Sequence, residues 1–328
     1  MTASAPTTSP TTDGATTQTR LQHFPITFFG VTMGVFGLAL TLKAGGFAAA
    51  SALMTGVGAL VFVVLFVLYG LKALRYPKAV AAEWGHPVRL SFFPAANISA
   101  LMLSLLSQQA FPAFSTSLWI VGAVVQAILT LVIISAWISH RPFGPAMLSP
   151  AWFIPAVANV IVPLGGTHLG LVEVSWYFFS VGVLFWLVLL TLVFNRLIFH
   201  DPLPGKLRPT LVILIAPPSV AFLAWTDLNG GNVDAMAHIL LSIGLFFGAL
   251  VAVQVPSLLR LPFAMSFWAL TFPLAALTTA LFRYGSMTDA LAYQTGGFVL
   301  LVLLIVTILA LSIRTTRAAL AGEICQPE

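Results

Sequence analysis

A short phrase built around proline recurs five times in this chain of 328 residues and constrains its fold more than any other feature. In each copy an aromatic or aliphatic residue precedes the proline, and small residues follow it. The five prolines are Pro25, Pro94, Pro155, Pro217 and Pro273, separated by 69, 61, 62 and 56 residues. A period of roughly 60 residues is typical of one structural unit that is repeated along the chain.

The composition tells what kind of unit is repeated. Hydrophobic residues make up 59% of the chain and charged residues only 7%, whereas a soluble domain carries about 25% charged residues. Two membrane helices of about 20 residues each, with their connections, fill one repeat. We therefore expect an all-α membrane protein with ten transmembrane helices, arranged as five repeated helical hairpins.

The ends of the chain differ from its middle. Residues 1–20 are rich in Thr, Ser, Ala and Pro and form no apolar run, which predicts a disordered N-terminal tail. Residues 21–315 are expected to form the ten-helix transmembrane domain, and residues 316–328 a C-terminal tail. The single cysteine, Cys325, excludes an internal disulfide and a Cys/His metal site, so we expect no metal and no cofactor.

The basic residues predict the orientation. Twelve of the 14 lysines and arginines lie in the N-terminal tail, the C-terminal tail and the connections from even to odd helices. The connections from odd to even helices hold only Lys43 and Arg283. By the positive-inside rule both termini are expected on the cytoplasmic side of the membrane. We expect this membrane to be a bacterial inner (plasma) membrane, with the helices in contact with the lipid bilayer. Because this topology explains the basic residues, the net charge of +5 does not indicate nucleic-acid binding.

The repeated prolines distinguish the odd helices from the even ones. Proline removes a backbone hydrogen bond and kinks a helix, and a membrane tolerates such a break only where it is buried or faces a water-filled cavity. Five kinked helices facing one axis form a pseudo-fivefold ring around a central pore, with the even helices outside. The alternative is that these prolines belong to ordinary helix packing and mark no pore, since membrane helices contain more proline than helices of soluble proteins.

The path through such a ring carries no charge at mid-span. No Asp, Glu, Lys or Arg falls in the middle of an expected span, which favours a passive pore over a proton-coupled pump. The N-terminal ends of half-helices carry partial positive charge and attract anions. The expected pore-lining residues are Phe24, Thr27, Phe28, Phe93, Asn97, Asn159 and Ser219.

Two other classes of function stay open at this point. A dicarboxylate carrier driven by a proton gradient needs titratable groups, and the candidates are His168, Glu173 and His238. A membrane enzyme or redox subunit needs histidines that face each other within the membrane or an acidic or zinc site. The six histidines fall near span ends or in loops instead, so we do not expect an enzyme.

Three short segments resemble one known family. They are residues 24–38, which begin with Phe24-Pro25; the run Pro150-Ala-Trp152-Phe-Ile-Pro155; and residues 268–274, which contain Phe272-Pro273. These segments look like those of the family of bacterial tellurite-resistance/dicarboxylate transporters and plant slow anion channels, and the resemblance extends over about residues 22–315.

The resemblance implies a ten-helix fold of five hairpins, a pore lined by the odd helices and a homotrimer with one pore in each subunit. It further implies that Phe272 occludes the pore as a gate. Permeant anions in the family range from chloride and nitrate to malate. We therefore expect an anion channel for small anions. The alternative is a proton-coupled C4-dicarboxylate transporter, malate-like in its substrate, or a tellurite-resistance protein.

Overall fold

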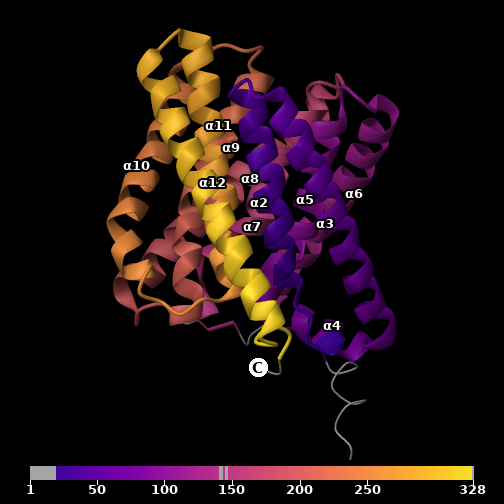
Figure 1. Cartoon of the computed structure of the whole chain (residues 1–328). Coiled ribbons are helices and arrows are strands. Elements are labelled where there is room, and N and C mark those ends of the chain that lie inside the picture. The colour runs from indigo at the N-terminus through magenta and orange to yellow at the C-terminus, as the bar shows by residue number, and fades with distance from the viewer. Residues whose placement is uncertain (1–19, 140–142, 145–146, 327–328) are drawn as a thin grey trace, which may run out of the picture.

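Five helical hairpins follow one another along the chain, as the repeat predicted (Figure 1). The computed structural model describes residues 20–139, 143–144 and 147–326, and this part of the chain is helical without strands. The hairpins are α2 (Phe29–Ala44) with α3 (Ala48–Arg75), α5 (Pro94–Ser107) with α6 (Pro112–Ser139), α7 (Phe153–Gly166) with α8 (Val172–Phe199), α9 (Ala216–Leu228) with α10 (Ala235–Leu258), and α11 (Thr271–Thr288) with α12 (Leu291–Leu320).

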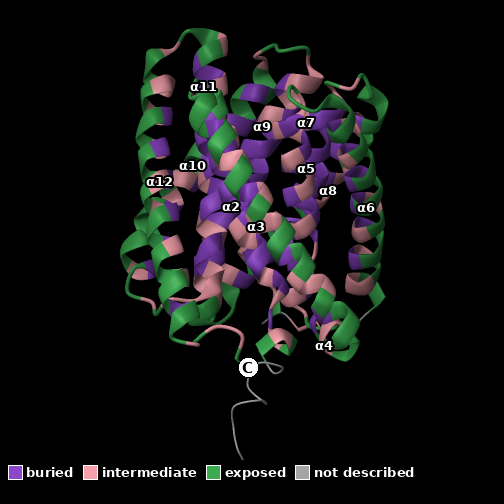
Figure 2. Cartoon of the chain, turned by 45° about the vertical axis from the view of Figure 1, so that its right-hand side comes forward, coloured by how far each residue is buried: buried purple, intermediate pink, exposed green. Residues whose placement is uncertain are grey.

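The helices form two layers. The inner helices α2, α5, α7, α9 and α11 each contact the next, and α11 contacts α2, so that they close a ring. Each outer helix packs mainly on its hairpin partner. Figure 2 shows the inner helices buried and the outer helices exposed. In the first hairpin, 72% of the most apolar 18-residue stretch of the inner span is buried, against 17% of that of the outer span.

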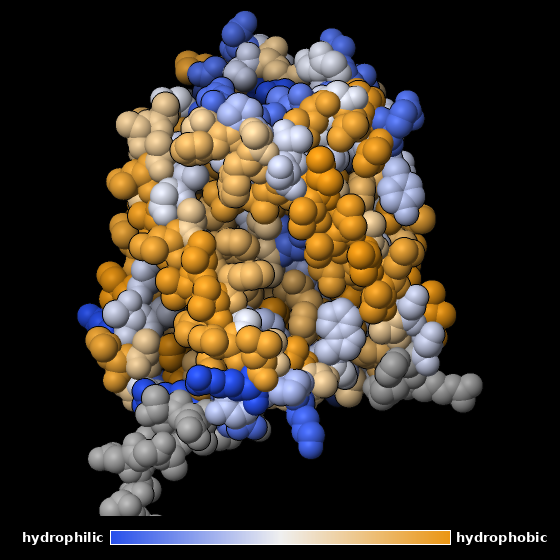
Figure 3. Space-filling model, turned by 90° about the vertical axis from the view of Figure 1, so that its right-hand side faces the viewer, coloured by the Kyte–Doolittle hydropathy of each residue, from blue (hydrophilic) through white to orange (hydrophobic). Residues whose placement is uncertain are grey.

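The outer layer has the surface of a membrane protein. Among the described residues, nine helical segments are long and apolar enough to cross a membrane, and the tenth, Pro150–Gly166, is shorter. Figure 3 shows a broad apolar belt, with hydrophilic residues gathered above and below it. The prediction of an all-α membrane protein with hairpin repeats is therefore confirmed.

The first and the last repeat close the ring through close helix contact. A Cβ atom added to Gly34 of α2 would lie only 2.3 Å from the Thr271 Oγ1 of α11, so only glycine fits at this crossing. Two turns further along α2, the Thr41 hydroxyl donates a 3.1 Å hydrogen bond to the Ala275 carbonyl of α11. Small residues at this crossing thus allow the first inner helix, α2, to pack closely against the last, α11.

The repeated prolines lie at the start of the inner helices and not in their middle. A 3-10 segment precedes each inner helix: η1 (Ile26–Phe28), η2 (Arg89–Phe92), η4 (Pro150–Trp152), η5 (Gly205–Ile215) and η6 (Met265–Leu270). Pro25 precedes η1, and Pro94, Pro155, Pro217 and Pro273 fall in the first three residues of α5, α7, α9 and α11. Proline suits a first turn because its missing N–H has no intrahelical partner there. The kink expected at each of these prolines is, in the structure, a junction of 3-10 and α-helix at the head of the inner helix.

Both ends of the described chain lie at the lower end of the molecule in Figure 1, where the short helix α4 (Pro77–Trp84) also lies. A Cβ atom on Gly322 would come within 2.9 Å of the Arg20 Nη2 atom, so the two ends touch. Helix α12 extends to Leu320, beyond the expected domain end at residue 315. Of the predicted N-terminal tail of residues 1–20, residues 1–19 lie outside the described residues.

Candidate functional site

Three cavities follow one another along the molecule, two of them inside the ring of inner helices and the third below it. The upper cavity has a volume of 320 Å³ and is lined by residues of all five inner helices. The central chamber has a volume of only 40 Å³. The lower cavity, at the end where the termini lie, has a volume of 570 Å³. The three cavities therefore form a path with its narrowest section in the middle, inside the ring.

Shared wall residues connect these cavities. Phe272 borders both the upper cavity and the central chamber. Thr27 and Met265 border both the central chamber and the lower cavity. The side chain of Phe272 is buried, so its ring separates the upper cavity from the chamber below it.

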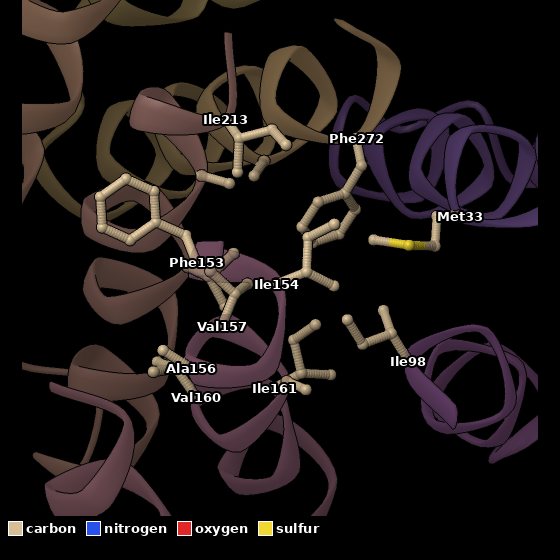
Figure 4. Packing of buried hydrophobic residues seen from close by; sticks show 14 of the residues in the cluster. Met33, Ile98, Phe153, Ile154, Ala156, Val157, Val160, Ile161, Ile213 and Phe272 are labelled. Carbon is tan, nitrogen blue, oxygen red and sulfur yellow. The ribbon is translucent and has the colours of Figure 1, made fainter. Parts of the chain in front are cut away.

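The narrow section is apolar and takes side chains from all five repeats. A large apolar side chain from each repeat lines the central chamber: Met33, Ile98, Ile154, Ile213 and Phe272. In Figure 4 the Phe272 ring points toward Ile154 and Met33, which come from other helices of the ring. No described residue of the chamber wall carries an ionisable side chain. An ion in this section would lose its hydration without a charged partner, which is costly.

The upper cavity widens from the gate toward a polar rim. Along α11, Phe272, Ala276, Thr279 and Arg283 line it at helical spacing. The other inner helices likewise contribute apolar stripes that end in one polar residue. We call these five residues the upper polar ring: Lys43, Gln108, His168, Asp227 and Arg283.

An ion pair joins two members of the upper polar ring. The Arg283 Nη2 atom lies 2.8 Å from the Asp227 Oδ1 atom, and the two side chains are 42% and 15% exposed. The His168 Nδ1 atom lies 2.8 Å from the Leu164 carbonyl oxygen, within its own helical turn. The upper end of the path therefore carries charges that remain open to the cavity.

The lower cavity contains a buried ion pair. The Lys72 Nζ atom lies 3.0 Å from the Glu83 Oε2 atom, and the side chains are 1% and 3% exposed. Lys72 also donates a 2.7 Å hydrogen bond to the Phe24 carbonyl, and the Tyr69 hydroxyl donates one of 2.8 Å to Glu83. Since all of these groups are partnered, this cluster ties α3, α4 and the start of the first repeat together.

The predicted aromatic and hydroxyl residues divide into two groups. Thr27 lines the chamber and the lower cavity, and Phe28 lines the lower cavity. Phe24 stacks on Phe28 with ring centroids 4.7 Å apart. Phe93 packs edge-on against Trp84 at 4.7 Å. Phe24 and Phe93 thus serve aromatic packing beside the path and do not line its cavities.

The amides of Asn97 and Asn159 require a correction, because they face helix α6 and not the path. Asn97 donates to the Gly122 carbonyl at 2.9 Å and to Gln126 at 3.1 Å. Asn159 donates to the Thr130 hydroxyl at 2.9 Å. A buried amide without a partner costs free energy in an apolar environment, and these bonds across helices satisfy both groups. They hold α5 and α7 against α6.

Ser219 is corrected in the same way. Its hydroxyl donates a 2.7 Å hydrogen bond to the Ile215 carbonyl, and a Cβ atom on Gly244 of α10 would lie 2.9 Å from it. Ser219 therefore packs between α9 and α10. Of the titratable candidates, only His168 lines a cavity, whereas Glu173 lies in the first turn of α8 and His238 lies on α10, 3.4 Å from the Tyr284 hydroxyl.

Sequence reasoning missed the apolar wall of the narrow section. Met33, Ile98, Ile154 and Ile213 stand among many similar residues in helices that are apolar on every side. Only their common position on the inner face distinguishes them, and this position follows from the ring. Among the described residues, no group of three or more His, Cys, Asp or Glu side chains is arranged to hold a metal ion.

Comparison with known proteins identifies the family. Residues 23–316 match the SLAC1 family model, described as a voltage-dependent anion channel. The S-type anion channel SLAH2 of Arabidopsis thaliana is 28% identical over 83% of this chain and 54% of its own length. The chain thus spans about half the length of the plant relatives it matches.

Microbial relatives match over more of their own length. The uncharacterized transporter MJ0762 of Methanocaldococcus jannaschii is 26% identical over 78% of this chain and 83% of its own. The tellurite resistance protein TehA homolog of Haemophilus influenzae is 25% identical over 78% and 80%. The resemblance to this family, inferred from three short segments, is confirmed. The chain belongs to the SLAC1 family of membrane anion channels and transporters.

Proposed function

We propose that this protein is a channel that passes small anions, such as chloride and nitrate, through the path enclosed by α2, α5, α7, α9 and α11. The observation that carries this proposal is the position of Phe272 between two cavities of one series. Around it, the other four repeats all contribute apolar side chains to the narrow section. The proposed gate is the Phe272 ring, and the path conducts when this ring moves aside.

The charges at the two ends of the path favour anions over cations. Lys43 and Arg283 line the upper cavity against one carboxylate, that of Asp227. Three cationic side chains line the lower cavity against two carboxylates: Lys72, Arg89 and Lys206 against Glu83 and Glu323. Each end therefore has a surplus of one positive charge, which raises the local concentration of anions.

The chemistry of the narrow section supports a channel over a proton-coupled carrier. A coupled carrier needs an ionisable group where the substrate binds within the membrane, and the described wall of the central chamber contains none. The name of the Haemophilus relative refers to tellurite resistance. Because tellurite is an oxyanion, it belongs among the anions to be tested on the same path.

The experiment is a current measurement in planar bilayers under a chloride gradient. Replacing Phe272 by Ala is expected to raise the anion current by about tenfold or more, the effect of lowering a barrier by about 1.4 kcal/mol. The matched control is Phe36→Ala, because Phe36 is fully buried on α2 but packs against Gly58 of the outer helix α3.

Three outcomes separate the possibilities. A large Phe272→Ala current that reverses near the chloride potential supports an anion channel gated by this ring. An equal rise in Phe36→Ala would assign the effect to loosened packing. No current from any variant, together with malate uptake driven by a pH gradient, would establish a carrier instead.

The assembly and the orientation are part of the proposal. We infer a homotrimer with one path in each subunit, in a bacterial plasma membrane with the lower end in the cytoplasm. The orientation rests on the basic residues, since the lower end holds Lys72, Arg75, Arg260 and Arg317, while only Lys43 and Arg283 were expected at the upper end. Chemical crosslinking in membranes tests the homotrimer. Labelling of a cysteine placed after Gly230 from one side of the membrane tests the orientation.

A further inference from the structure

We propose that the upper polar ring is a binding site for anions with a planar oxygen face, such as nitrate or a carboxylate. In this site Arg283 and Lys43 contact the anion, and Asp227 competes with the anion for Arg283. The inference rests on the proposed function as an anion pathway and adds the residues that select the anion at its upper entrance.

The first observation is the convergence of the ring residues. Lys43, Gln108, His168, Asp227 and Arg283 come from five different repeats and line one cavity of 320 Å³. Lys43 and Arg283 are also the only basic residues in the connections that the sequence places at this end. Both of them therefore reach the same cavity, which concentrates positive potential where an anion enters.

The second observation is the incomplete pairing of Arg283. Its Nη2 atom donates a 2.8 Å hydrogen bond to the Asp227 Oδ1 atom. Its Nε atom is buried without a hydrogen-bond partner among the described residues, whereas 42% of the side chain as a whole is exposed. A guanidinium carries five donors in one plane, so Arg283 keeps donors for a second partner that enters the cavity.

The third observation is the local charge balance. Asp227 is the only carboxylate among the described residues of the cavity wall, against two permanent cations. The other acidic residues near this end, Glu173, Asp234 and Asp289, do not line the cavity. The cavity wall therefore carries a net positive charge, which attracts anions.

The geometry of the cations indicates the class of anion. An Arg side chain binds carboxylates and oxyanions through two parallel donors, whereas a spherical ion such as chloride gains nothing from the planar fork. Along α11 the ring lies eleven residues from Phe272, or about 16 Å at 1.5 Å per residue. An anion held by Arg283 therefore waits above the gate and does not obstruct it.

The test measures binding by purified protein in detergent, from the rise in melting temperature as sodium nitrate or sodium chloride is titrated at constant ionic strength. Arg283→Gln is expected to raise the half-saturating nitrate concentration about tenfold, the usual effect of losing a charge-assisted hydrogen bond. Arg283→Lys keeps the charge but is expected to lose the preference for nitrate over chloride. Asp227→Asn releases Arg283 and is expected to lower the half-saturating nitrate concentration.

Arg260→Gln is the matched control, because Arg260 is an exposed arginine near the lower end that lines none of the cavities. Half-saturating nitrate concentrations that are the same in the wild type, Arg283→Gln and Asp227→Asn would overturn the inference. This readout does not depend on conduction, so nitrate binding lost in Arg283→Gln supports the site even if Phe272→Ala passes no current. Such a pair of results would reject the proposed channel function and leave the proposed binding site supported.

Discussion

The two ends of the path each contain a basic side chain paired with a carboxylate, and the two pairs differ in their surroundings. At the lower end the Lys72 and Glu83 side chains are 1% and 3% exposed. At the upper end the Arg283 and Asp227 side chains are 42% and 15% exposed. The distances, 3.0 and 2.8 Å, are nearly equal, so distance alone does not distinguish the pairs.

The difference lies in what remains for other partners. Lys72 already binds Glu83 and the Phe24 carbonyl, and its ammonium group also lies 5.4 Å from the centre of the Tyr69 ring. Arg283 has one carboxylate partner and an unpartnered Nε atom. A buried, saturated pair stabilises the fold around it, whereas a half-exposed pair with free donors is available to a ligand. Substitutions at the two ends test this comparison.

The largest effect is expected from Lys72→Met. This change leaves the Glu83 carboxylate buried beside an apolar side chain, and breaking a buried pair in this way costs about 3–5 kcal/mol. The free energy of unfolding, measured in detergent, should fall by that amount. The double variant Lys72→Met/Glu83→Gln should recover part of the loss, because glutamine removes the buried charge and still accepts the bond from Tyr69. Wild-type stability in Lys72→Met would contradict the structural role of the lower pair.

A smaller effect on stability is expected at the upper end. Arg283→Gln and Asp227→Asn remove a pair that water partly screens, which is worth at most about 1 kcal/mol. Their effect should instead appear in nitrate binding. The comparison fails if these variants destabilise the protein as much as Lys72→Met does.

The smallest effect on stability is expected from replacing Asp234, which lies near the same upper end of the path as Asp227. Asp234 caps helix α10, since its Oδ1 atom accepts a 2.9 Å hydrogen bond from the Ala237 N–H. This backbone bond holds the pKa of Asp234 below its ordinary value. The stabilisation is therefore present above the carboxyl pKa of the unfolded chain, about 3.9, and is lost as the pH falls through the lower pKa of the folded state.

Replacing Asp234 by Ala should lower the melting temperature slightly at neutral pH, with the difference from the wild type disappearing in strong acid. Nitrate binding should stay unchanged, in contrast to Asp227→Asn. A melting temperature difference that persists below the titration range of Asp234 would show that its charge is not the cause.

The repeat phrase and the hydrophobic pattern were enough to predict the hairpins and the two layers. Such features are local: a proline favours the first turn of a helix wherever it stands, and some 20 apolar residues are long enough to span a membrane. The regular spacing of the five prolines from Pro25 to Pro273 therefore predicted five units without any knowledge of their contacts.

The positions of individual polar side chains required the tertiary structure. Asn97 and Asn159 were expected to line the pore, but a buried amide takes the nearest partner, and the partners lie on α6. Likewise only the closure of the ring brings Asp227 to within 2.8 Å of Arg283, 56 residues further along the chain.

The sequence by itself determined that this chain crosses the membrane repeatedly in hairpins, because apolar length and proline position act within each segment. The tertiary structure decided which residues form the path. In helices that are apolar on every side no periodicity marks an inner face, so Met33, Ile98, Ile154 and Ile213 became recognisable beside Phe272 only when the five repeats closed around the central chamber.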